Sequence, residues 1–194
     1  MASVLTATLP IEYLEEHGPE RVRQLALDMA SMLSFASGHV GLALDLDWSL
    51  RLADNAFRAQ VLRYPGIDLR AAWLHERWMG IHVDGVHWLN FLGPPTLTQL
   101  GGATALKSRL DSAGTTLVEL DEQRVLVSLG ERPEAGDLAT GRSLPAYREL
   151  ARVLQPWLEP LFLDPCWETE RDPRYTKLVL TEEEARRWWR RFLD

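Results

Sequence analysis

The sequence predicts an α+β fold: an antiparallel or mixed β-sheet with hairpins, and helices packed on it. Two hairpin signatures, around Asp84-Gly85 and Asp121-Glu122, are antiparallel by construction. Stretches with apolar residues at helical spacing lie before, between and after them. No strand is followed by a glycine-rich phosphate loop, which argues against a nucleotide-binding α/β fold.

The N-terminal third predicts two strands and three helical segments. Val4 to Leu9 reads as an opening strand, and IEYLEEH as a short helical turn that Gly18 ends. Pro19 suits the first residue of a longer helix, because its missing N–H costs nothing there. A buried strand is expected at His39 to Asp45, and a further helix from about Ser49 to Arg63. Tyr64-Pro65-Gly66 ends that helix, because proline disfavours helical geometry in the residue before it.

The remainder predicts two hairpins and four further helices. Asp84-Gly85 lies between IHV and VHWLNFL, and Pro94-Pro95 ends the second run. Two short helices separated by Gly101-Gly102 follow. The second hairpin joins TTLVEL to RVLVSLG. After a polar loop at Glu131 to Ser143, we expect a helix from Leu144 to about Leu158. A last helix is capped by Thr181, with Glu184 completing a capping box.

Bulk composition indicates one globular domain, residues 1–194, with 46% hydrophobic and 25% charged residues. Cys166 is the only cysteine, so no intramolecular disulfide can form. The N-terminus lacks the pattern of a signal peptide, and no apolar stretch is long enough for a membrane span. We therefore expect a cytoplasmic protein that does not enter a membrane.

The strongest candidate for chemistry is a group of histidines. His75, His82 and His87 lie close together in sequence, and a turn at Asp84-Gly85 would place His82 opposite His87. Directly opposed side chains on a hairpin are near enough to share a zinc ion. A zinc site needs three or four ligands, and the sequence does not place the others. A metal-dependent hydrolase using these three histidines therefore stays an alternative rather than the main hypothesis.

Other catalytic patterns are weaker still. Cys166 has no histidine near it in sequence, and no G-x-S-x-G elbow is present. Paired carboxylates such as Glu15-Glu16 are typical of solvated surface. We expect no enzyme activity, no cofactor and no bound metal.

The charge indicates what the partner is. The net charge of −7 repels phosphate backbones, so we expect no nucleic-acid binding and favour a basic protein partner. Eight tryptophans is a high number for this length. Exposed ones would serve as anchors at a protein interface, including that of a homodimer.

An ordered set of segments resembles the bacterial type VI immunity family, formerly a family of unknown function. The resemblance spans about residues 10 to 193, and His87 stands where the family pattern has a polar residue such as asparagine. The segments are EYLEEHGPERV from Glu12, SGHVGLA from Ser37, RYPGID from Arg63, GVHWLNFLG from Gly85, LGG from Leu100, RPEAGD from Arg132 and LPAYR from Leu144.

The resemblance implies a cognate antidote that binds a toxin, with a DNase as the first expectation, and it implies no catalytic residues. From charge and expected exposure we place the toxin-binding surface among acidic residues near turns. These are Asp45, Asp47, Asp84, Asp121, Glu122, Glu131, Glu134 and Asp137. The alternatives are the histidine hydrolase and a module that binds a protein other than a toxin.

Overall fold

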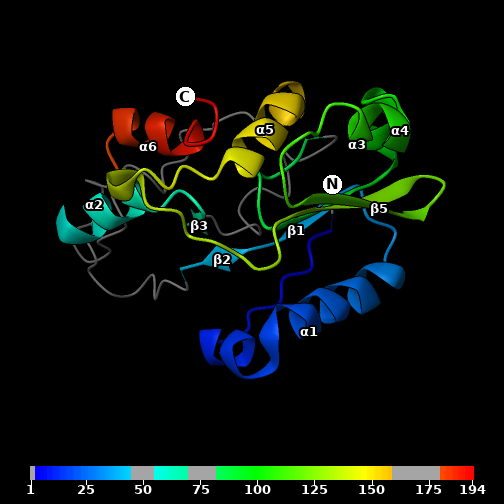
Figure 1. Ribbon diagram of the computed structural model, residues 1–194, viewed down its shortest axis with the longest axis horizontal. Coiled ribbons are helices and arrows are strands. Elements are labelled where there is room, and N and C mark those ends of the chain that lie inside the picture. Colours follow the sequence, from blue (N-terminus) through cyan, green and yellow to red (C-terminus); the bar gives the residue numbers. More distant parts are fainter. Residues whose placement is uncertain (1–2, 45–54, 70–81, 159–179) are drawn as a thin grey trace.

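The computed structural model (Figure 1) describes residues 3–44, 55–69, 82–158 and 180–194. Its α-helices are α1 (Ile11–Ser31), α2 (Asn55–Arg63), α3 (Pro94–Gln99), α4 (Gly102–Lys107), α5 (Pro145–Leu154) and α6 (Glu182–Trp189). Its strands are β1 (Ser37–Val40), β2 (Leu42–Ala43), β3 (Ile67–Asp68), β4 (Leu89–Leu92), β5 (Thr115–Asp121) and β6 (Arg124–Leu129). Short 3₁₀ helices, η2 and η3, lie at Leu138–Thr140 and Gln155–Trp157.

Four strands form one antiparallel sheet in the order β1-β4-β6-β5. A second, two-stranded sheet pairs β2 with β3 in parallel. Figure 1 shows α1 below the main sheet and α3, α4 and α5 above it. The α+β prediction, with its antiparallel or mixed sheet and packed helices, is thus confirmed.

The hydrophobic core lies where both faces of the central strands are covered. On one face, Arg23 of α1 donates to the Ser128 hydroxyl and stacks over Trp88. On the other, Leu150 of α5 is fully buried. Because β6 is covered on both sides, Val125 to Leu129 are all buried, and the strand reads as an almost unbroken apolar run.

The first helix forms as its sequence predicts, and the opening strand does not. Gly18 has φ 75°, outside helical geometry, and divides α1 into a short piece and a longer one that begins at Pro19. Residues 3–10 have no regular structure, so the strand expected at Val4 to Leu9 is wrong. Leu5 is 63% exposed, and apolar β-prone residues make no strand without a neighbouring strand to pair with.

The two hairpin predictions have opposite outcomes. The hairpin of β5 and β6 is confirmed, but its turn is formed by Glu122 and Gln123, one residue later than the expected Asp121-Glu122, because Asp121 still pairs with Arg124. The hairpin at Asp84-Gly85 is wrong: Val83 instead bridges Leu158 in parallel. Gly85 has φ 85°, but Asp84 is not among the residues with positive φ, so the two-residue turn, which needs positive φ at both positions, is not formed.

The strand expected at His39 to Asp45 is present as β1 and β2, although its residues are half-buried or exposed rather than fully buried. The end of α2 at Arg63, before Tyr64-Pro65-Gly66, is confirmed. Gly66 is required there, because a Cβ atom would lie 2.0 Å from the Glu134 carbonyl oxygen.

The later helices also follow their signals. The chain leaves β4 at Gly93 and enters α3 at Pro94. The expected helix from Leu144 is α5 followed by the 3₁₀ turn η3. Thr181 and Glu184 form the predicted capping box of α6. Among the described residues, no helix is long and apolar enough to cross a membrane.

Candidate functional site

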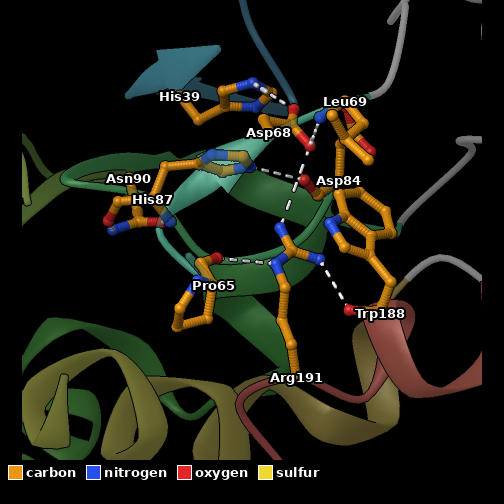
Figure 2. A network of polar contacts seen from close by, with 9 residues as sticks. All are labelled: His39, Pro65, Asp68, Leu69, Asp84, His87, Asn90, Trp188 and Arg191. Atoms are coloured by element: carbon orange, nitrogen blue, oxygen red, sulfur yellow. Dashed lines mark hydrogen bonds and ion pairs between the residues drawn. The ribbon is translucent and has the colours of Figure 1, made fainter. Parts of the chain in front are cut away.

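A buried polar junction joins four separate parts of the chain (Figure 2). His39 comes from β1, Asp68 from β3, His87 precedes β4, and Arg191 follows α6. Asp68 and His87 are both buried. Burying so many polar groups is costly unless they satisfy one another, so the contacts decide what the junction does.

Arg191 fastens the C-terminal helix to the two-stranded sheet. Its Nε donates to the Pro65 carbonyl at 2.9 Å, and its Nη1 donates to the Trp188 carbonyl at 3.1 Å. Nη2 lies 3.8 Å from Oδ1 of Asp68, with both side chains over nine-tenths buried. The guanidinium also stacks on the Trp188 ring, 3.9 Å from its centroid. Arginine suits this position because its planar head can bind and stack at once.

His87 is held as a neutral donor. Its backbone N–H donates to Oδ1 of Asn90 at 2.9 Å, and its Nε2 lies 2.8 Å from the Asp84 carbonyl. A carbonyl only accepts, so Nε2 carries the proton. Burial lowers the pKa of His87 well below its usual value, and the nearby His39 lowers it further. The two imidazole rings stack with centroids 3.7 Å apart.

His39, Asp68 and His87 bring possible metal-ligand atoms within 4.8 Å of one another. Their arrangement suits an ion poorly. The rings are nearly parallel, at 12°, so their lone pairs do not converge on one point. The cation of Arg191 already lies beside Asp68 and would repel a metal ion. We therefore assign the junction to folding, where it ties β1, β3 and the start of β4 to the C-terminal segment.

The structure does not bring together the pair of histidines, His82 and His87, that the sequence predicted. The prediction that His82 lies opposite His87 required a hairpin at Asp84-Gly85. Because that hairpin is not formed, the prediction is wrong. His87 stacks on His39 instead, and the carbonyl of His82 accepts from the Ser37 hydroxyl. His75 lies outside the described residues.

Two of the predicted acidic surface residues are buried, contrary to expectation. Asp84 is 4% exposed and Asp137 is 6% exposed. Asp137 accepts two hydrogen bonds of 2.7 Å from Arg63 and one from the backbone N–H of Ala139. The Arg63 hydrogen bond lowers the pKa of Asp137 to about 2. This ion pair attaches the end of α2 to the loop between Glu131 and Ser143.

Four of the predicted residues are exposed and form two groups, while Asp45 and Asp47 lie outside the described residues. Asp121 and Glu122 stand at the turn of the β5–β6 hairpin, and Glu131 and Glu134 lie beyond the other end of β6. Six residues of strand separate the groups by roughly 20 Å. Hydrogen bonds from the Gln123 backbone and the Arg124 side chain lower the pKa of Asp121, so it stays ionised.

A groove of about 620 Å³ borders the hairpin turn. Arg124 lines it and donates to the carbonyls of Ala30, in the last turn of α1, and Leu33, just after α1. Met32, also in the lining, is 78% exposed. An exposed methionine beside an acidic turn is typical of a protein-binding surface, where methionine is enriched.

The tryptophans do not supply exposed anchors in the described part of the chain. Trp88 and Trp188 are buried, and Trp157 and Trp189 are half-buried. The features that sequence reasoning missed are the junction and the groove. Met32 is the C-cap residue of α1, so its exposure depends on where that helix ends.

Comparison with known proteins gives a family and a fold. The model of the family TsiV, described as type VI immunity for VRR-NUC, matches residues 1–192. No curated protein matches. A solved structure of the Pseudomonas aeruginosa T6SS protein PA0821 is similar, with a TM-score of 0.70 and 24% identity. The similarity covers 95% of this chain but 51% of that one, so this chain spans about half its length.

Proposed function

We infer the function from one premise: the chain belongs to TsiV, the family of type VI immunity proteins for VRR-NUC. We propose that it binds a cognate VRR-NUC nuclease toxin and neutralises it by covering the active site or the surface that holds the substrate. The family match across residues 1–192 is the observation that carries this proposal.

Charge supports a blocking mechanism. A nuclease must hold phosphates, which requires a basic surface. A protein with a net charge of −7 is attracted to such a surface and competes there with nucleic acid. The same attraction accelerates association, which matters for an antidote that must reach its toxin before the toxin reaches DNA.

The buried junction supports binding rather than chemistry. His87 and Asp68 of the junction are both buried and committed to partners within the fold. A toxin side chain could not reach them without opening the core. Because a nuclease toxin acts on nucleic acid inside the cell, we propose that the antidote works in the cytoplasm.

The test is co-expression with the VRR-NUC toxin encoded beside this protein. Cells carrying both should survive, and the purified proteins should form a complex with a nanomolar or tighter Kd. An immunity protein from an unrelated toxin pair is the control and should not rescue. Failure to rescue cells from any adjacently encoded nuclease, together with no measurable complex, would end the proposal.

A further inference from the structure

Strand β5 is an edge of the main sheet. It pairs with β6 on one side, and within the described residues no strand pairs with its other side. Figure 1 shows the β5–β6 hairpin projecting at the end of the sheet. An open edge presents unpaired backbone N–H and C=O groups, which another chain can use to add a strand.

The hydrogen-bond pattern identifies which backbone groups face outward. Leu129 of β6 donates to β4, at the Trp88 carbonyl, whereas Gly130 donates to the Gly114 carbonyl just before β5. In an antiparallel ladder these directions alternate along the chain. Thr116 and Val118 therefore point their backbone groups at β6, and Leu117 and Glu119 point theirs at the open edge.

The side chains on this edge combine an apolar contact with negative charge. Val118 is 50% exposed although it lies opposite the buried Leu126. Glu119, Asp121 and Glu122 are exposed beside it. Residues 115–134 contain five acidic and two basic residues, which gives this segment a net charge of 5 − 2 = 3 negative units.

The ordinary role of charge on an edge strand is protection against self-association. That role accounts for the register shift between Glu119 and Asp121 and for the acidic residues themselves, since like charges repel a second copy of this chain. The same charges attract a basic strand. The exposed Val118 offers such a strand an apolar contact in addition.

We propose that an extended basic segment of the toxin adds to β5 as a fifth strand of the main sheet. The inference rests on the proposed function, because it takes the basic partner from it. Leu117 and Glu119 exchange backbone hydrogen bonds with the added strand, and Val118 and the acidic side chains contact its residues. The groove beside the turn extends this surface, because Asp121 lines it too.

Substitution at Glu119 separates the backbone contribution from the charge. Glu119→Pro deletes an outward N–H and obstructs an added strand, and proline is tolerated at an edge where the N–H faces solvent. Glu119→Gln removes only the charge and is the matched control. We expect Glu119→Gln to weaken toxin binding a few-fold, and Glu119→Pro to weaken it roughly 100-fold. Circular dichroism and thermal unfolding check that both variants fold.

Amide hydrogen exchange on the wild-type protein gives a second test that does not depend on a variant. On complex formation, the amides of Leu117 and Glu119 should become protected, because they acquire acceptors on the toxin. Equal affinity of the two Glu119 variants, or unchanged exchange at both amides in a complex that does form, would overturn edge docking. If the wild-type protein forms no complex at all, the proposed function has failed instead.

Discussion

The buried junction around Asp68 and the open edge of β5 both concentrate polar groups, and they use them differently. In the junction the side chains of Arg191 and His87 are bound to backbone carbonyls of the same chain. On the edge, Glu119 and Glu122 are exposed to solvent. The difference teaches that residue type alone does not mark a functional site in this fold. His87, which looks catalytic in sequence, is buried and bound within the fold, whereas we propose that the toxin binds at ordinary exposed glutamates.

The largest expected effect comes from breaking the junction. Arg191→Met removes the donors to the Pro65 and Trp188 carbonyls and leaves Asp68 without its buried cation. Removing one partner of a buried ion pair typically costs about 3–5 kcal/mol. Urea denaturation should show a loss of this size.

The matched control is Arg190→Met, one residue earlier. Arg190 pairs with Asp194 at the surface, so its loss should leave the unfolding midpoint almost unchanged. If both variants unfold at the same urea concentration, the junction does not hold the C-terminal helix in place.

A pH dependence of intermediate size should follow from His87. Its pKa is lowered in the folded state, so below the usual pKa of about 6.5 the unfolded chain binds a proton that the folded chain does not. This contribution to stability is present above about pH 6.5 and declines as the pH falls, by at most about 1.4 kcal/mol per pH unit. His87→Gln keeps an N–H donor and cannot titrate. Unfolding between pH 7.5 and 5.5 should show a smaller decline for this variant; parallel declines would contradict the assignment of a neutral His87.

The smallest effect on stability is expected at the edge, where binding should change instead. Glu122→Lys combined with Glu131→Lys reverses charge at both ends of the hairpin. Association with the toxin should slow about tenfold at low salt and depend less on salt concentration, with thermal unfolding unchanged. Glu15→Lys with Glu16→Lys makes the same change in net charge on α1. Equal slowing by the two double variants would mean that overall charge acts, and not the hairpin surface.

Local signals predicted local structure well. The capping box at Thr181, the kink at Gly18 and the β5–β6 hairpin each depend on residues near in sequence. The hairpin predicted at Asp84-Gly85 does not form because the residue before the turn, Val83, pairs with a distant segment. It bridges Leu158 instead. A turn residue can permit a hairpin, but the partner strand decides whether one forms.

The candidate sites were less predictable because they depend on long-range packing. His39 meets His87 only because β1 pairs with β4, with His39 opposite Asn90. Asp137 looked like an exposed loop carboxylate, and its partner Arg63 lies at the end of α2. The exposure of Glu122 and Glu131 could be predicted from the sequence, because turn and loop residues tend to lie at the surface.

The most direct test of the central claim, neutralisation by binding alone, is a titration of toxin nuclease activity with this protein. An antidote that covers the toxin surface should abolish cleavage at an equimolar ratio, and nuclease activity should return when the complex is dissociated. Loss of activity at far below one antidote per toxin, without recovery after separation, would show that the protein modifies its toxin chemically and would contradict the account.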